Sequence, residues 1–326
     1  MNNQLTKIIK LIFVSYPQYM ETKAKKSLGQ HWLKEEKYLD LIVDTADPTA
    51  DEIVLEIGPG TGLLTEKLLK LAGKVIAVEK DHELVDSLRK KFKEEIKNSK
   101  IDIIEKDILD FDPTSCFSSS REFPRPKGAE RLAVSPPQPL GNGSPANPSA
   151  LSPAHKKSSY KIVANIPYYI TGAILKKFLT AGHQPEKMVL LVQKEVAERI
   201  VARDGKESIL SISVKVYGKP RLVLKVPAGA FSPPPKVDSA ILEIKNISKN
   251  FFTKEKIEEK AFFRVVRVGF SSKRKTLLNN LGALFGRKET QIGLKNCQIA
   301  ENTRAERLTL PNWLCITREF TKAAKK

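Results

Sequence analysis

The sequence predicts an α/β protein, in which a doubly wound, mostly parallel sheet is followed by a small helical domain. Two observations lead to this expectation. From about residue 50, short apolar runs alternate with segments of helical apolar spacing, which is typical of a parallel sheet covered by helices. Near residue 247 the pattern changes to basic, helical segments. The 326 residues are enough for two domains.

The first half of the sheet is predicted from five consecutive segments. They are strands at 52–58, 74–79 and 101–107 and helices at 62–73 and 82–96. The first strand stops at a glycine, and the helix after it ends on Gly73. The order strand, helix, strand, helix, strand implies a parallel sheet.

The sheet resumes at residue 160 after a break in the pattern. Strands are expected at 160–165, 187–193, 221–227 and 238–245, and helices at 171–182 and 194–205. Residues 208–218 are ambiguous. Their β-branched content favours a strand, whereas their apolar spacing also fits a helix.

Three regions depart from the alternating pattern. Residues 1–22 are predicted to be a disordered extension, because their apolar run is short and interrupted, and Met20 resembles a natural start. Residues 113–159 are rich in Pro, Ser and Gly, which predicts a disordered insertion within an α/β domain over 23–246. For residues 113–159, a solvated loop without a functional role is favoured over an arm that contacts RNA. Residues 247–326 form the predicted helical domain.

The charge balance favours a polyanionic partner. The formal net charge is +19, from 56 Lys and Arg against 37 Asp and Glu. Residues 247–326 contain 18 Lys and Arg against 7 Glu and no Asp, a net charge of +11. More than half of the excess therefore lies on a quarter of the chain. Clustering of this kind favours nucleic acid over a uniformly solvated basic surface.

The cysteines and histidines show no ligand or disulfide spacing. Cys116, Cys297 and Cys315 are odd in number and far apart, and no CxxC pair occurs. The four histidines are also scattered. We therefore expect a reducing, cytoplasmic location, no disulfide framework and no metal site.

A glycine-rich loop follows the first strand. Gly58, Gly60 and Gly62 are spaced GxGxG, whereas a dinucleotide site would need a glycine in place of Leu63. Glu56 lies two residues before the first glycine. Its carboxylate would repel a pyrophosphate but attract a sulfonium or an ammonium group. The loop therefore favours S-adenosylmethionine, which is cationic and has no phosphate.

Two further acidic residues end strands. Glu79 lies 21 residues after Gly58, where a carboxylate can accept hydrogen bonds from both ribose hydroxyls. Asp107 could accept a hydrogen bond from the amino group of the cofactor's adenine. Each acid alone also fits a solvated strand end. Together with Glu56, they favour a methyltransferase over a dehydrogenase.

The fourth strand ends in the sequence NIPY, residues 165–168. Ligands of parallel sheets bind at the carboxyl ends of the strands, so Asn165 and Tyr168 are expected in one cleft. The Asn165 side-chain oxygen and the Ile166 carbonyl can each accept a hydrogen from an exocyclic adenine amine. Tyr168 can stack on the base, worth roughly 1–3 kcal/mol. The alternative without a catalytic role is a proline-anchored turn with a capping asparagine.

These residues and several further segments resemble the ribosomal RNA small-subunit adenine dimethyltransferases. The segments are KKSLGQHWL (25–33), EIGPGTG (56–62), NIPYYI (165–170), LVQKEVAERI (191–200), FSPPPKVDSA (231–240), GFSSKRKTLLNNL (269–281) and RAERLTL (304–310). The resemblance covers about residues 23–320, without the insertion. It implies transfer of methyl groups from S-adenosylmethionine to the N6 amines of two adjacent adenosines near the 3′ end of small-subunit (16S) rRNA. The implied fold is a Rossmann-like methyltransferase domain followed by a helical domain that docks rRNA.

The resemblance also implies roles for individual residues. For the cofactor, it places Gln30, His31 and Leu33 near the methionine, Gly58, Gly60 and Glu79 at the backbone and ribose, and Asp107 and Ile108 at the adenine. For the target base, it implies contacts from Asn165, Pro167 and Tyr168, and Asn165 also touches the cofactor. The family often has Asn-Phe where this chain has His31 and Trp32. His31 can still donate a hydrogen bond to the cofactor. The alternative is a purely structural role as a cap at the start of a helix.

Two segments are candidates for contact with RNA. The proline run 233–235 forces an extended backbone, which either walls the target-base pocket together with Phe231 or simply links the last strands. Lys273, Arg274 and Lys275 are expected at a helix start, where clustered cations neutralise phosphates. A solvated helix end is the alternative.

Other functions are compatible with parts of this pattern. A large-subunit (23S) rRNA methyltransferase that confers antibiotic resistance would share NIPY and the glycine loop. A ribosome-assembly binding factor and a DNA adenine methyltransferase are further alternatives. The FSPPPKVDSA and RAERLTL segments favour the small-subunit enzyme. It is expected to act as a monomer on a pre-30S particle, without a membrane or a metal.

Overall fold

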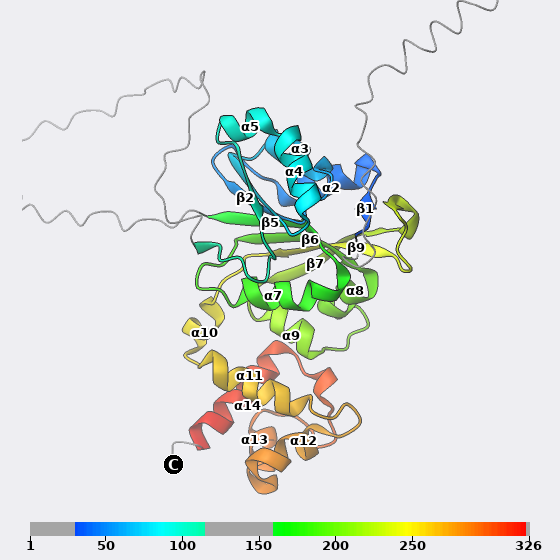
Figure 1. The fold of residues 1–326 in the computed structure, drawn as a ribbon. Coiled ribbons are helices and arrows are strands. Elements are labelled where there is room, and N and C mark those ends of the chain that lie inside the picture. The colour runs from blue at the N-terminus through cyan, green and yellow to red at the C-terminus, as the bar shows by residue number, and fades with distance from the viewer. Residues whose placement is uncertain (1–29, 115–158, 324–326) are drawn as a thin grey trace, which may run out of the picture.

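The structure is a computed structural model that describes residues 30–114 and 159–323 (Figure 1). The predicted extension 1–22 and nearly all of the predicted insertion 113–159 lie outside the described residues. A central sheet covered by helices makes up the described chain to residue 245. From residue 250 onward its described elements are all helices.

The central sheet has seven strands in the order β4-β3-β2-β5-β6-β9-β7. They are β2 (Ile53–Ile57), β3 (Lys74–Glu79), β4 (Ile101–Glu105), β5 (Tyr160–Asn165), β6 (Lys187–Gln193), β7 (Lys219–Val226) and β9 (Ser239–Lys245). The first five are parallel, and β9 runs antiparallel to both β6 and β7. The predicted doubly wound, mostly parallel sheet is therefore confirmed. Because the chain order reverses between β2 and β5, their carboxyl ends form the switch point where such sheets bind ligands.

Helices cover both faces of this sheet (Figure 1). Their bounds are α2 (Glu36–Ala46), α3 (Leu63–Leu69), α4 (His82–Lys91) and α5 (Lys93–Lys97) before the break, and α7 (Thr171–Leu179), α8 (Lys194–Val201) and α9 (Ile209–Lys215) after it. α2, α3 and α4 pack with Val54 and Val75 on one face, and α7, α8 and α9 pack with Leu55 and Ile162 on the other. Burial on both faces explains why these strands are continuously apolar.

Two helical predictions change in detail. The ambiguous segment 208–218 forms helix α9, because Ser208 and Ser211 make a reciprocal capping box at its start. The Ser208 hydroxyl accepts from the Ser211 N–H at 3.1 Å, and the Ser211 hydroxyl accepts from the Ser208 N–H at 2.6 Å. The predicted helix 82–96 is divided into α4 and α5 at the buried residue Phe92.

The last part of the described chain is a bundle of helices. They are α10 (Asn250–Glu255), α11 (Glu259–Gly269), α12 (Leu277–Phe285), α13 (Arg287–Asn296) and α14 (Leu310–Ala323). Trp313 is fully buried where α14 crosses α11, and a Cβ on Gly269 would lie 2.3 Å from its ring. Only glycine permits this close approach. The apolar core continues from the sheet into the bundle through Tyr217 and Phe252, whose ring centroids are 5.6 Å apart.

A disulfide in the bundle corrects the expectation of no disulfide framework. Cys297 follows α13, and its sulfur is bonded to that of Cys315 on α14, with the Cα atoms 5.8 Å apart. The folding of the bundle brings together two cysteines that are 18 residues apart in sequence. Linear spacing does not reveal this proximity. Cys116 lies outside the described residues.

Two short strands tie the start of the described chain to the proline run. β1 (Trp32–Leu33) pairs antiparallel with β8 (Phe231–Ser232). The 3-10 turn η2 (Tyr168–Ile170) joins β5 to α7, η3 (Ala228–Ala230) joins β7 to β8, and η4 (Ala305–Arg307) precedes α14. No helix in residues 30–114 or 159–323 is long and apolar enough to cross a membrane.

Candidate active site

A cavity of about 200 Å³ lies at the carboxyl ends of the parallel strands. It brings together ten of the residues predicted for the cofactor and the target base. These are Gln30, His31, Gly58, Gly60, Glu79, Asp107, Ile108, Asn165, Pro167 and Tyr168. Leu33, Glu56 and Phe231, which the sequence also predicts near the ligands, do not line it. Six of these residues, Gly58, Gly60, Glu79, Asp107, Asn165 and Tyr168, are predicted from the ends of the strands, and the other four come from the family resemblance.

The glycine loop after β2 forms one side of the cavity. Gly58, Gly60 and Gly62 all have positive φ, at 67°, 58° and 78°, a conformation that is costly for other residues. A Cβ on Gly58 would meet only the Asn165 carbonyl oxygen, at 3.8 Å, so it would project into open space. A Cβ on Gly60 would lie 3.2 Å from Trp32 Nε1. Gly58 thus keeps the backbone accessible to a ligand, whereas the space beside Gly60 is taken by the Trp32 indole.

Glu79 ends β3, and its side chain contacts this loop. Its Oε2 accepts from the Gly60 N–H at 3.2 Å, and its Oε1 accepts from the N–H groups of Lys80 and Asp81 at 2.8 and 3.0 Å. Burial nevertheless raises the pKa of Glu79 above its usual range, with these three hydrogen bonds acting in the opposite direction. Oε2, which accepts only one of these hydrogen bonds, keeps a lone pair for a further donor such as a ribose hydroxyl.

The position of Glu56 corrects its predicted role beside a cationic cofactor. Its side chain is only 1% exposed and accepts a hydrogen bond from the Thr65 hydroxyl of α3 at 2.7 Å. Side chains alternate between the faces of β2, so Glu56 points to the α3 side. Burial raises the pKa of Glu56 to about 8. Because Glu56 points to α3 and does not line the cavity, it is not placed to face a sulfonium.

Asp107 and Ile108 form the far end of the cavity, beyond β4. Asp107 Oδ2 accepts from Lys80 Nζ at 2.8 Å, and its Oδ1 accepts from the Leu109 N–H at 2.9 Å. The hydrogen bond from Lys80 lowers the pKa of Asp107, so its carboxylate is charged at neutral pH. Ile108 is buried beside it. The pair offers an acceptor and an apolar surface, which suits the edge and face of an adenine.

Asn165 stands at the end of β5 with a defined amide orientation. Its Nδ2 donates to the main-chain carbonyl of His31 at 3.0 Å. A carbonyl can only accept, so the atom that faces it must be the nitrogen. The Asn165 Oδ1 is the remaining amide atom, and it is an acceptor. This is the group that the sequence predicts to hold an adenine amine.

Tyr168 and His31 form the aromatic wall of the cavity. The Tyr168 hydroxyl and the Ser239 hydroxyl are 2.6 Å apart, and burial raises the pKa of Tyr168. The His31 ring lies nearly parallel to the Tyr168 ring, with the centroids 6.2 Å apart. His31 Nδ1 donates to the Pro233 carbonyl at 2.8 Å, which joins the aromatic wall to the proline run.

Leu33 and Phe231 are corrections to the predicted contacts. They pair across β1 and β8, and their side chains are 3% and 1% exposed in the apolar core. Phe231 is therefore unavailable as a wall for an RNA base, and only the main chain of Leu33 could reach a cofactor. The segment instead contributes the Pro233 carbonyl that His31 contacts.

Trp32 is a wall residue that the sequence reasoning did not assign. It lines the cavity, and its indole lies against Gly60. The available signal is its place between two predicted site residues, His31 and Leu33. Because side chains alternate along a strand, Trp32 and the buried Leu33 point to opposite sides of β1.

The residues present fit S-adenosylmethionine. The cavity wall combines the open backbone at Gly58, a carboxylate at Glu79 that can accept from a ribose hydroxyl, and a carboxylate at Asp107 that can accept from the adenine amino group. None of these features requires a phosphate. Among residues 30–114 and 159–323, no group of three or more His, Cys, Asp or Glu side chains is placed to hold a metal ion.

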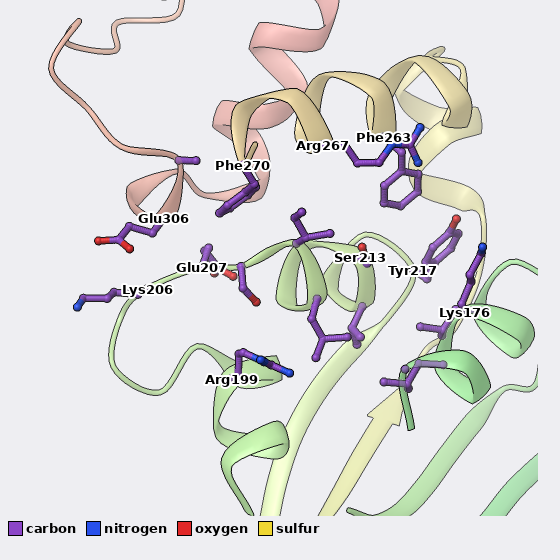
Figure 2. Close-up of a pocket in the computed structure, with 18 of the residues that line it drawn as sticks. Lys176, Arg199, Lys206, Glu207, Ser213, Tyr217, Phe263, Arg267, Phe270 and Glu306 are labelled. Atoms are coloured by element: carbon purple, nitrogen blue, oxygen red, sulfur yellow. The ribbon is translucent and has the colours of Figure 1, made fainter. Parts of the chain in front are cut away.

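A larger groove, of about 1430 Å³, lies between the sheet domain and the helical bundle (Figure 2). Phe263, Arg267 and Phe270 of the α11 region face Arg199 and Tyr217 across it. Seven basic and seven acidic side chains line the groove, so it carries no net charge that would attract a polyanion. It lacks the glycine loop after β2 and the strand-end residues Glu79, Asp107 and Asn165, so we place the chemistry in the smaller cavity despite the difference in size.

Lys273, Arg274 and Lys275 lie in the turn between α11 and α12, before the cap residue Thr276. All three side chains are exposed, and Lys273 is at the edge of the groove. The cluster is therefore accessible, although it precedes the helix rather than forming its first turn.

The fold and the cavity together define a Rossmann-like methyltransferase that uses S-adenosylmethionine. The ribosomal RNA adenine dimethylase family matches residues 21–322. The chain belongs to this family. It is an S-adenosylmethionine-dependent rRNA methyltransferase, as the resemblance in the sequence implies.

Individual relatives agree with this assignment. The chain is 41% identical over 298 residues to the ribosomal RNA small subunit methyltransferase A of Dehalococcoides mccartyi strain BAV1, with 90% of this chain and 88% of that protein covered. It is 35% identical to the protein of the same name from Synechococcus elongatus, with 89% and 93% covered. A solved dimethyladenosine transferase from Plasmodium falciparum superposes with a TM-score of 0.66 at 26% identity, covering 90% and 98% of the two chains.

Proposed function

We propose that this protein transfers methyl groups to the N6 amines of two adjacent adenosines near the 3′ end of small-subunit (16S) rRNA. The relatives at 33–42% identity are small-subunit rRNA methyltransferases by name. The observation that carries the proposal is the orientation of Asn165, whose Nδ2 is engaged by His31 and whose Oδ1 remains as an acceptor. An adenine amine supplies the matching donors.

The cofactor half of the cavity holds the methyl donor in this proposal. Glu79 would accept from the ribose, Asp107 and Ile108 would bind the adenine, and Gly58 in the glycine loop with Gly60 would allow close approach to the backbone. Gln30 lies toward the methionine end, where its Nε2 donates to Asp81 Oδ2 at 3.1 Å. When bound, S-adenosylmethionine supplies a methyl group that is already activated by its sulfonium. The residues therefore need to place and orient the two reactants.

The target half of the cavity holds the amine. Asn165 Oδ1 and the Ile166 carbonyl each accept one amine hydrogen, which directs the nitrogen lone pair toward the methyl group. Tyr168 stacks on the base, and Pro167 sets the backbone that positions both groups. An adenosine in duplex RNA must first leave its stack, at a cost of a few kcal/mol.

The basic helical domain provides phosphate contacts in this proposal. Lys273, Arg274 and Lys275 form an exposed cationic cluster, and such clusters bind RNA with strong dependence on salt. Reversing these three charges is expected to lower RNA affinity and flatten its dependence on salt concentration. We further propose a cytoplasmic protein that acts as a monomer on a pre-30S particle.

Methyl transfer to ribosomal subunits tests the proposal directly. Unmodified small and large subunits are incubated with the protein and radiolabelled S-adenosylmethionine, and the modified bases are mapped. We expect label on two adjacent adenosines of small-subunit rRNA and none on the large subunit. Label on the large subunit alone would favour the antibiotic-resistance enzyme. Binding of small subunits without transfer would favour an assembly factor.

A further inference from the structure

Tyr169 is the most exposed large apolar side chain in the described residues, at 69%. It follows Tyr168 directly and lines the same cavity. The two rings differ in their surroundings. Tyr168 is held inside by Ser239, whereas most of the Tyr169 ring faces solvent. Successive residues of a 3-10 turn such as η2 point about 120° apart, which accounts for the divergence.

The surroundings of Tyr169 include both an apolar side chain and charged groups, because Lys80 and Lys106 also line the cavity. Leu109, at the same cavity, is also exposed, at 38%. The nearby cation Lys80 is paired with Asp107 at 2.8 Å, so its charge is offset. The flat ring of an exposed tyrosine suits the face of a nucleobase. Exposed apolar groups beside a binding cavity commonly mark an interaction site.

The reaction supplies a ligand for this surface. When the target adenosine enters the cavity, the adjacent nucleotide remains at the mouth, because one phosphodiester joins them. That neighbour has lost a stacking partner. An exposed tyrosine at the mouth can replace the lost partner, because every base offers a π face.

We propose that Tyr169, with Leu109 at the same mouth, is a stacking platform for the base next to the target adenosine. The inference rests on the proposed RNA substrate and adds a second base-binding position to it. The platform holds the neighbouring base outside the cavity while Tyr168 holds the target base inside. The ring could instead cover the edge of the cofactor's adenine, and the test separates these roles.

The test compares Tyr169→Ala, Tyr169→Phe and Tyr169→Trp in the full-length protein. For the alanine variant we expect the KM for RNA to rise about tenfold, which lies within the range that base stacking on an aromatic side chain produces. The Kd for S-adenosylmethionine, measured by calorimetry without RNA, should change less than about twofold. The phenylalanine and tryptophan variants should keep the wild-type KM, because both retain a ring. Ile292→Ala, at a residue 61% exposed on α13, is the matched control.

A fluorescent base reports the contact without turnover. RNA that carries 2-aminopurine next to the target adenosine should be quenched on binding to the wild-type protein and to Tyr169→Phe, but less quenched with Tyr169→Ala. Unchanged RNA KM and unchanged quenching in Tyr169→Ala would overturn the platform. A raised Kd for S-adenosylmethionine with an unchanged KM for RNA would overturn it in favour of a cofactor cover.

The outcome is separable from that of the proposed function. If the wild-type protein modifies a different RNA, the proposed substrate fails, and the same variants are measured on the RNA that it does modify. If it methylates small-subunit rRNA normally and Tyr169→Ala behaves like Ile292→Ala, the platform alone fails.

Discussion

The two halves of the cavity are built differently. The cofactor half consists of strand ends and a glycine loop whose contacts lie close in sequence, such as Gly60 to Glu79 across 19 residues. The target half, in which we include His31 although the resemblance places it near the cofactor's methionine, is assembled from distant segments. Asn165 reaches His31 across 134 residues, His31 reaches Pro233 across 202, and Tyr168 reaches Ser239 across 71. The comparison suggests that a cofactor site can be specified by local backbone geometry, whereas the base site depends on tertiary packing.

Removing the amide of the target half gives the largest expected effect. Asn165→Ala deletes the acceptor for the target amine, so kcat should fall at least about a hundredfold, the usual loss for a group that stabilises the transition state. The Kd for S-adenosylmethionine should change only a few fold. Single-turnover transfer and calorimetry measure the two quantities. Equal losses in both would show that the halves are not separable.

The buried carboxyl of β2 gives the next largest effect, on stability. Glu56 has a pKa of about 8 in the folded protein and near 4.5 when unfolded. Between these values the folded state binds the extra proton, so the free energy of unfolding falls as pH rises. Glu56→Gln should remove this dependence, which amounts to about 2 kcal/mol between pH 6 and 8. Urea unfolding at both pH values provides the measurement, and parallel pH profiles for the two proteins would contradict the expectation.

A methyl group on the glycine loop tests the cofactor half. Gly60→Ala combines a φ of 58° with a contact 3.2 Å from Trp32. We expect a loss of about 1–2 kcal/mol in stability and about tenfold weaker binding of S-adenosylmethionine. Gly172→Ala is the matched control, because it lies in α7 with no heavy atom within 4 Å of the new Cβ. Thermal unfolding and calorimetry compare the two variants, and similar behaviour of both would remove the proposed constraint.

Two variants of His31 distinguish the role of its hydrogen bond from that of its ring, and they carry the smallest expected effect. His31→Asn keeps a donor at the position of Nδ1 for the Pro233 carbonyl but removes the ring beside Tyr168. His31→Phe keeps a ring but removes the donor. If the hydrogen bond positions the wall, the phenylalanine variant should lose about fivefold in kcat/KM for RNA, from about 1 kcal/mol, and the asparagine variant less. The reverse order would assign the role to the ring.

The features that could be predicted from the sequence depend on local segments, and those that could not depend on distant ones, as in the two halves of the cavity. The order of strands and helices, the glycine loop and the acids at the ends of β3 and β4 are read from local spacing, because each depends on a few neighbouring residues. The failures involve side chains that distant elements surround. Phe231 packs in the core through its pairing with β1, and Cys297 after α13 meets Cys315 of α14 only when the bundle forms.

By itself the sequence determined the parallel sheet, the position of the glycine loop at its edge and the residues Glu79, Asp107 and Asn165 at successive strand ends. Only the tertiary structure decided which way the Asn165 amide faces, that Glu56 is buried against Thr65, and that Tyr169 is exposed while Tyr168 is enclosed. Periodicity and turn residues act over a few positions along the chain. Burial and hydrogen-bond partners depend on segments that meet only in the folded molecule.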